Sequence, residues 1–155
     1  MPLEIERRFL VTRDEWRQYI VARTFLRQAY LNTDPDRVVR IRLTDDKAHI
    51  TIKGRTTGCA RSEFEYAIAP NDVEALFALC VTPVLEKVRY DVRIGDRLWT
   101  VDVFQGRHEG LVLAECEFES VEAAAQAVLP DWAGPEVTHD ARYTNAVLAG
   151  LSSSA

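Results

Sequence analysis

The 155-residue sequence lacks the features that several classes of protein require. Its three cysteines, Cys59, Cys80 and Cys116, are widely spaced and form no CxxC pair, which argues against a zinc site. No apolar run approaches the ~18 residues of a membrane span. The formal net charge is −5, so no basic excess points to nucleic acid. We therefore expect a cytoplasmic protein with free thiols and with no nucleic-acid or membrane partner.

The chain also lacks internal repeats and any linker rich in proline, glycine or serine, apart from a serine run near its end. We therefore expect a single domain over residues 1–150, followed by a flexible tail over residues 151–155. With 47% hydrophobic and 28% charged residues, the composition is that of an ordinary globular protein with a core of its own.

Short segments of alternating apolar and polar residues dominate the chain, and turn-forming residues such as Gly95-Asp96 separate several of them. Strands are expected at residues 3–10, 25–31, 37–44, 47–53, 61–69, 84–94, 97–104 and 111–119. Helices are expected after Thr12 with Glu15 at capping-box spacing, over 72–80 after Asn71, over 121–128 after Ser120, and from about 140 to Gly150. Short connections between so many strands predict an α+β protein built on an antiparallel sheet or barrel.

Nearly every predicted strand has one bulky apolar face and one charged face, because neighbouring strand residues point to opposite sides. The basic members of the charged faces are Arg8, Arg40, Arg42, Lys53, Arg61, Lys87 and Arg89, and the acidic members are Glu4, Glu6, Glu63, Glu65, Asp102, Glu115 and Glu117. A half-buried sheet with its polar face in water explains one such strand.

Across seven strands, the scarcity of neutral polar residues on these faces favours another interpretation. Arginine grips phosphate oxygens, and clustered carboxylates are the hard ligands of Mg²⁺ or Mn²⁺. Inside a closed barrel, so many charges would be costly unless they were paired or bound to ligands. A polyanion together with divalent metal ions would satisfy both sets of charges.

The sequence resembles the CYTH superfamily, the triphosphate tunnel metalloenzymes. Glu4-Ile5-Glu6-Arg7-Arg8 is similar to the ExExK signature of that family. Further blocks follow in the family's order: Arg40-Ile41-Arg42, Thr51-Ile52-Lys53-Gly54, Glu63-Phe64-Glu65, Glu86 to Tyr90, Val101 to Phe104, Ala114 to Glu117, and Glu136 to Asn145. The resemblance covers nearly the whole chain.

The resemblance implies an eight-stranded antiparallel barrel that forms a tunnel, with helices packed on its outside. It implies metal-dependent hydrolysis or cyclisation of triphosphate compounds. Carried over position by position, Arg8, Arg40, Arg42, Lys53, Lys87 and Arg89 would hold phosphates, and Glu4, Glu6, Glu115 and Glu117 would bind Mg²⁺ or Mn²⁺ with Asp102 nearby. Glu63 and Glu65 would orient basic residues, hold a second metal or place the attacking water.

One position departs from the family signature, because Arg8 stands where the motif has lysine. Lysine can lose its proton when it is desolvated, whereas arginine effectively cannot. If the family's lysine accepts a proton, Arg8 would slow turnover; if it only clamps charge, Arg8 would suffice. Tyr30, which shares a strand face with Gln28, is a second candidate for handling protons, or a hydroxyl that only forms hydrogen bonds.

The expected activity is hydrolysis of inorganic triphosphate, since the inward faces have few aromatic residues to hold an organic group. The alternatives are adenylate cyclisation, thiamine triphosphate hydrolysis, and a polyphosphate- or nucleotide-binding module without catalysis. A structural barrel without any ligand would leave the inward charges unexplained. The number of apolar outer faces also leaves open a homodimer that pairs two barrels, as in relatives of this family.

Overall fold

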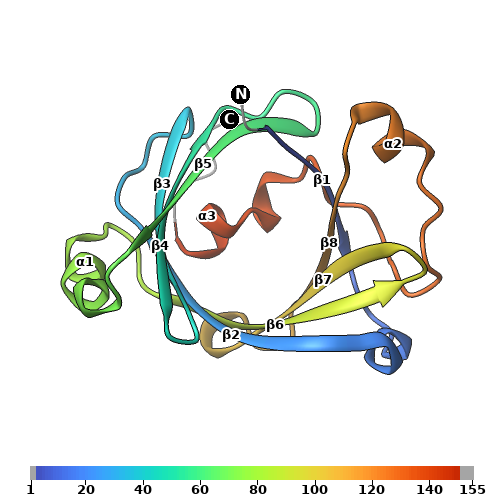
Figure 1. Cartoon of the computed structure of the whole chain (residues 1–155), viewed down its shortest axis with the longest axis horizontal. Coiled ribbons are helices and arrows are strands. Elements are labelled where there is room, and N and C mark those ends of the chain that lie inside the picture. The colour runs from blue at the N-terminus through green and yellow to red at the C-terminus, as the bar shows by residue number, and fades with distance from the viewer. Residues whose placement is uncertain (1–2, 151–155) are drawn as a thin grey trace.

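A computed structural model describes residues 3–150 of the chain. The expected tail over residues 151–155 lies outside the described residues. Eight antiparallel strands form a closed barrel in the order β1-β5-β4-β3-β2-β6-β7-β8 (Figure 1). The strands are β1 (Leu3–Leu10), β2 (Ile20–Tyr30), β3 (Arg37–Thr44), β4 (Lys47–Gly54), β5 (Ala60–Ile68), β6 (Leu85–Ile94), β7 (Arg97–Phe104) and β8 (Val112–Glu117). The predicted α+β barrel is confirmed.

The β6–β7 hairpin shows how local sequence sets the register of the barrel. Strands β6 and β7 pair from Ile94 and Arg97, on either side of the predicted Gly95-Asp96 turn. Gly95 has a φ of 61°, a left-handed conformation that glycine adopts without steric cost. Because the register is fixed from this turn, Arg89 lies opposite Asp102 across the two strands.

The barrel closes where the first strand meets two strands that are distant in the sequence. β1 pairs with β5 through Leu3 to Ile5 and with β8 through Glu6 to Leu10. This seam places Glu6 opposite Glu117 and Arg8 opposite Glu115. Charged residues of the first and last strands therefore meet inside the barrel.

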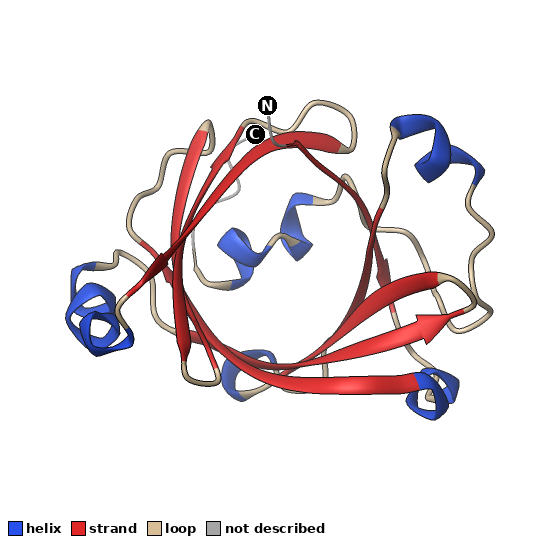
Figure 2. Ribbon diagram, in the orientation of Figure 1, coloured by secondary structure: helices blue, strands red, loops and turns tan. Residues whose placement is uncertain are grey.

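The helices are short, and several of them lie outside the ring of strands (Figure 2). Single-turn 3₁₀ helices form at η1 (Glu15–Tyr19), η2 (Pro70–Asp72), η3 (Gly106–His108) and η4 (Ala141–Tyr143), and the α-helices are α1 (Val73–Leu79), α2 (Val121–Gln126) and α3 (Asn145–Leu148). Among the described residues, no helix is long and apolar enough to cross a lipid bilayer.

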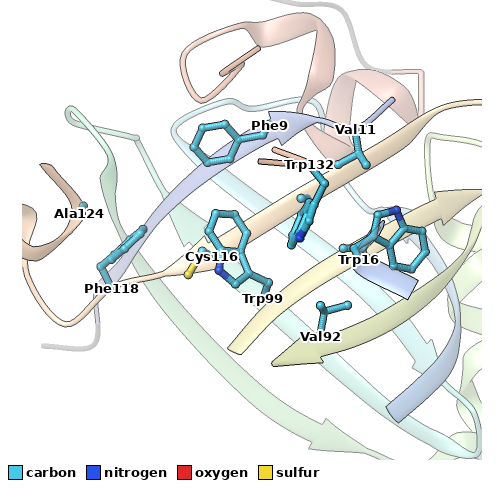
Figure 3. Packing of buried hydrophobic residues seen from close by; sticks show 11 residues of the cluster. Phe9, Val11, Trp16, Val92, Trp99, Cys116, Phe118, Ala124 and Trp132 are labelled. Atoms are coloured by element: carbon cyan, nitrogen blue, oxygen red, sulfur yellow. The ribbon is translucent and has the colours of Figure 1, made fainter. Parts of the chain in front are cut away.

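The main core lies on the outer face of the barrel, beneath η1, α2 and the segment after α2. Phe9, Trp16, Trp99 and Trp132 are each at most 4% exposed there (Figure 3). The ring centroids of Trp99 and Trp132 are 5.4 Å apart in an edge-to-face arrangement. A second cluster, which includes Ile41 and Phe77, joins α1 to the barrel. The apolar strand faces therefore point outward, as predicted.

The expected helical segments differ from the structure in their caps and bounds. No capping box forms after Thr12: η1 begins after Asp14, which makes no side-chain cap, and β2 starts at Ile20 rather than near residue 25. Asp72, rather than Asn71, precedes α1. Ser120 does cap α2, since its hydroxyl accepts a hydrogen bond from the backbone N–H of Ala123 at 3.0 Å.

The C-terminal segment is the part that differs most from a helix packed on the outside. The single helix expected over residues 140–150 is divided into η4 and α3, and both lie within the ring of strands in the view of Figure 1. They pack against Tyr30, Leu85, Phe104 and Leu113, which lie on the same faces of their strands as the inward charged residues. One end of the barrel interior is thus apolar and is filled by this segment.

Candidate active site

A cavity of about 1000 Å³ lies inside the barrel. It is lined by most of the site residues predicted from the sequence: Glu4, Glu6, Arg8, Tyr30, Arg40, Arg42, Lys53, Glu63, Glu65, Arg89, Glu115 and Glu117. Lys87 and Asp102 are not part of this lining, and they are 0% and 1% exposed. The seven charged strand faces therefore do converge, as the alternation predicted, but two of their members lie behind the cavity wall.

Three carboxylates on β1 and β8 form a candidate metal site. One oxygen each from Glu4, Glu6 and Glu117 lies within 4.8 Å of the others. Burial, followed by repulsion from Glu115 and Glu4, raises the pKa of Glu6 to about 8. Burial and the proximity of Glu4 also raise the pKa of Glu117. This cluster has an excess of negative charge, and a divalent cation would relieve it.

Lys53 joins this cluster to Glu63. Its Nζ atom donates hydrogen bonds to the two carboxylate oxygens of Glu4 at 2.9 and 3.0 Å, and lies 3.3 Å from Glu63. Burial acts to raise the pKa of Glu4, but the Lys53 charge and hydrogen bonds lower it overall. The pKa of Glu63 is raised by burial and by the hydrogen bond with Glu4. Glu63 therefore lies beside the candidate metal site.

Arg8 lies between two carboxylates of the seam. Its Nε atom is 3.2 Å from Glu115 and its Nη2 atom is 3.1 Å from Glu6. Burial would raise the pKa of Glu115, yet the Arg8 charge contributes most to lowering it to about 2. The Nη1 atom of Arg8 is buried and has no partner among the described residues. This free N–H group could bind an anion, since unpaired buried donors are costly.

Asp102 lies apart from the candidate metal cluster, in an ion-pair triad behind the cavity wall. Arg89 binds both of its oxygens, with Nε at 2.8 Å and Nη2 at 2.9 Å, and Lys87 Nζ lies at 2.7 Å. These two cations outweigh burial and lower the pKa of Asp102. Burial lowers the pKa of Lys87 to about 7 despite its contact with Asp102. Asp102 as a metal ligand and Lys87 as a phosphate ligand stay predictions.

A further group of cations lies on β3, β4 and β5. Arg40 donates from Nη2 to the Thr51 hydroxyl at 3.2 Å, and that hydroxyl donates to Glu65 at 3.0 Å. Arg40 and Glu65 are 3.9 Å apart. The hydroxyl of Thr51 therefore links a cation to a carboxylate and fixes the orientation of both.

Arg42 and Arg61 have neutral partners instead. Arg42 donates to Gln28 Oε1 at 2.8 Å, and Arg61 donates to the backbone carbonyl of Gly54 at 3.1 Å. Within residues 3–150, neither forms an ion pair. Burial and the nearby charges of Arg40 and Arg89 lower the pKa of Arg42 to about 9. These two guanidinium groups therefore keep an uncompensated positive charge inside the barrel.

Sequence reasoning left several cavity residues without a role. Thr51 and Arg61 are on the charged faces of their strands and line the cavity, but the sequence assigned neither of them a role in binding or catalysis. Gln28 is 0% exposed and holds Arg42. Asn145 belongs to the C-terminal block, and no strand pattern could have placed it inside the barrel, because α3 is not part of the sheet.

Comparison with known proteins identifies the class to which this barrel belongs. The CYTH domain model matches residues 2–143, and the chain belongs to that family. An inorganic triphosphatase of Acetivibrio thermocellus is 42% identical over 149 residues, which cover 96% of this chain and 94% of that protein. An inorganic triphosphatase of Nitrosomonas europaea is 38% identical over 149 residues, covering 94% of this chain and 96% of that protein.

Solved structures agree with this assignment. The crystal structure of the inorganic triphosphatase NE1496 matches with a TM-score of 0.69 and 36% identity, covering 96% of this chain and 95% of the other. The PH1012 protein of Pyrococcus horikoshii matches with a TM-score of 0.64 at 17% identity, covering 79% of this chain and 83% of the other. The second match shows a common fold only.

Proposed function

We propose that this protein hydrolyses inorganic triphosphate in a metal-dependent reaction inside its barrel. The observation that supports this most is the cavity, where the Glu4, Glu6 and Glu117 cluster lies among the inward guanidinium groups. A triphosphate carrying divalent metal presents negative oxygens to the cations and positive charge to the carboxylates. Two relatives that match nearly the whole chain are named inorganic triphosphatases.

The residues present suit a divalent cation. Glu4, Glu6 and Glu117 would hold it, with Glu115 beside them, because oxygen ligands are those that Mg²⁺ and Mn²⁺ prefer. When bound, such an ion polarises a phosphoryl oxygen or acidifies a water molecule. We assign Mg²⁺ or Mn²⁺ as the cofactor.

The protein's own contribution is to position the substrate and stabilise its charge. Phosphoryl transfer spreads negative charge over the equatorial oxygens of the transferred group. Arg40, Arg42 and Arg89 line the cavity where those oxygens would lie, and the unpaired Nη1 of Arg8 adds a further donor. We assign to Glu63 and Glu65 the task of orienting basic residues, holding a second metal or placing the attacking water. Tyr30 lines the same cavity near α3.

The lining favours inorganic triphosphate over a nucleotide or thiamine triphosphate. Tyr30 and Trp99 are the aromatic residues among the described lining, and Trp99 is 1% exposed within the outer core. An organic group usually binds to apolar or aromatic surface, which this cavity offers little of. Adenylate cyclisation and thiamine triphosphate hydrolysis are therefore second candidates.

The test is phosphate release from tripolyphosphate, ATP and thiamine triphosphate, each with Mg²⁺, with Mn²⁺ and with a chelator. We expect fast release from tripolyphosphate with metal, much slower release from the two organic compounds, and none with chelator. Release from no compound, together with tight tripolyphosphate binding, would instead indicate a receptor without catalysis. Faster release from an organic triphosphate would overturn the assigned substrate.

We also propose a homodimer in a reducing cytoplasm. The three cysteines are free thiols, which fits a reducing compartment. Val39, Ile52 and Phe64 are adjacent in register on the outside of β3, β4 and β5, and Tyr66 beside them is 56% exposed. Sedimentation velocity would distinguish the dimer from a monomer, and Tyr66→Lys should weaken the dimer if this face forms it.

A further inference from the structure

The α3 segment is held in the barrel by several contacts, although it is only four residues long. A helix of this length is not stable by itself, so its position depends on its anchors. Thr144 caps it by accepting a hydrogen bond from the Val147 N–H at 3.2 Å. Arg107 donates to the Leu148 carbonyl at 3.2 Å, and Leu148 is buried in the apolar cluster at that end of the barrel. These contacts fix where Asn145 lies.

Asn145 is the first residue of α3 and lines the cavity. Its Oδ1 atom accepts a hydrogen bond at 3.0 Å from Nζ of Lys87, which is 0% exposed behind it. The ion pair with Asp102 at 2.7 Å favours the ammonium form of Lys87, which can only donate, so the amide presents its oxygen to Lys87. The orientation of the Asn145 amide is therefore fixed by its contact with Lys87.

The same contact determines what the other end of the amide can do. With Oδ1 turned toward Lys87, the Nδ2 group is the part of Asn145 left for the cavity, and the hydrogen bond to Lys87 is the one that the Asn145 side chain makes within residues 3–150. Polarisation by a neighbouring cation strengthens an amide N–H as a donor. An oriented and unpaired donor in a cavity that already contains several cations suits an anionic oxygen.

We propose that Asn145 is a substrate-binding residue, which donates a hydrogen bond from Nδ2 to a phosphate oxygen. Lys87 then acts through Asn145, by fixing and polarising its amide, rather than by touching the phosphate. This explains how a fully buried lysine can contribute to phosphate binding. The inference rests on the proposed function, since it takes the ligand of the cavity to be a phosphate chain.

The first test compares Asn145→Asp with the wild-type protein. Aspartate has nearly the same shape and still accepts from Lys87, but it lacks the N–H donor and adds a negative charge. We expect KM for tripolyphosphate with Mg²⁺ to rise at least tenfold, and the dissociation constant without metal to rise similarly. The melting temperature should stay at or above that of the wild type. An unchanged KM and dissociation constant would overturn the proposal.

Leu148→Ala is the matched control, because it loosens α3 without altering the amide. If Asn145 only kept α3 in place, this control would raise KM as much as Asn145→Asp does. If Asn145 binds phosphate, Leu148→Ala lowers the melting temperature while KM changes much less. A structural role for Asn145 therefore predicts similar increases in KM for the two variants, whereas a binding role predicts a much larger increase for Asn145→Asp.

A second readout does not require activity. The chain has three lysines, Lys47, Lys53 and Lys87, so acetylation at each can be followed by mass spectrometry. Lys47 is exposed and serves as the internal reference. Lys87 should react far more slowly than Lys47 in the wild type and in Asn145→Asp, and faster in Asn145→Gly. Equal reactivity of Lys87 in the wild type and in Asn145→Gly would overturn the contact on which the proposal depends.

These measurements separate the inference from the proposed function. A wild-type protein that binds tripolyphosphate without hydrolysing it would refute the proposed function, and the binding constants would still test Asn145. If the wild-type enzyme hydrolyses tripolyphosphate but has the same KM and dissociation constant as Asn145→Asp, the inference alone is refuted. Absence of any binding would refute both.

Discussion

At the scale of single residues, the environment of each charged group inside the barrel assigns it a distinct task. Arg8, Lys53, Lys87 and Arg89 are held by carboxylates, whereas Arg42 is held by the neutral Gln28. A neutral partner orients a guanidinium group without cancelling its charge. The cations inside the barrel are therefore unequal in how much charge they offer to an anion.

Substituting Gln28 tests this difference. Gln28→Glu would pair Arg42 with a carboxylate, so we expect KM for tripolyphosphate to rise about tenfold, or about 1.4 kcal/mol of binding, with kcat nearly unchanged. Gln28→Met removes the acceptor without adding charge and should have a smaller effect on KM. Steady-state kinetics at saturating Mg²⁺ measures both. A larger effect from methionine would show that orientation of Arg42 matters more than its charge.

Glu6 is expected to lower the stability of the metal-free protein at alkaline pH. Its pKa is raised to about 8 by burial and by neighbouring carboxylates, so the folded state binds a proton that the unfolded state releases near pH 4.5. The stability contributed by that proton is present below pH 4.5 and is lost as the pH rises to 8. Glu6→Gln should therefore stabilise the chelated protein at pH 8, by up to about 4 kcal/mol.

The measurement is urea unfolding in the presence of chelator at pH 5 and pH 8. The gain in stability should be clearly larger at pH 8, and the same variant should lose metal-dependent turnover. Glu109→Gln, at an exposed position, is the control and should change neither property. A Glu6→Gln variant with full activity would remove Glu6 from the site.

At the scale of elements, the strands were predictable from the sequence, whereas the helical segments were less so. Alternation over β1, β3, β4, β5, β6, β7 and β8 gave the strands to within a residue or two, because one face of each is apolar and the other charged. The first five residues of β2 were not in the predicted strand, and η1 did not have the predicted cap. Tertiary packing of Trp16, rather than capping chemistry, positions that turn.

The same reasoning explains which part of the site was found. Strand parity places a side chain inside or outside the barrel, so the lining carboxylates and guanidinium groups followed from the pattern. Parity does not say how deep along the barrel a residue lies. The family resemblance, rather than parity, placed Asp102 near the metal ligands, and its pairing with Arg89 and Lys87 could be seen only in the folded chain. Asn145 is not on a strand, so only the folded chain places it in the cavity.

The cap of α2 provides a prediction at this scale. Ser120→Ala removes the acceptor for the Ala123 N–H, so we expect a loss of about 1 kcal/mol in the free energy of unfolding. Ser120→Asp keeps an acceptor at this position and should lose much less. Urea unfolding followed by tryptophan fluorescence measures both. An equal loss in the two variants would show that the cap does not stabilise this helix in the folded protein.

At the scale of the whole molecule, the usual arrangement of a small protein is inverted. Most of the large apolar side chains lie between the barrel and its outer segments, and the interior holds charge except at the apolar end that α3 fills. The outer core must therefore stabilise the ring of strands from outside, since ion pairs moved out of water contribute little net stability.

Trp132 tests how much the outer core contributes. It lies after α2, is 4% exposed, and packs against Trp99 of β7. Trp132→Ala should lower the free energy of unfolding by about 3–5 kcal/mol, because it leaves a cavity over the barrel wall. Val128→Ala, in the same segment but 94% exposed, should change it little. If the Trp132 variant were as stable as the Val128 variant, the segment after α2 would not be part of the core.

The β1–β8 seam has a consequence for the order in which the molecule forms. Glu4 and Glu6 come from the first strand and Glu117 from the last, so the three carboxylates meet only once the two edges of the sheet have joined. Contacts between distant parts of a chain form late, because their loop-closure entropy is large. Like charges brought together at that step oppose it, and a divalent ion would favour it. The rate of refolding should then depend on metal concentration, and the active site should form only when β1 pairs with β8 and closes the barrel.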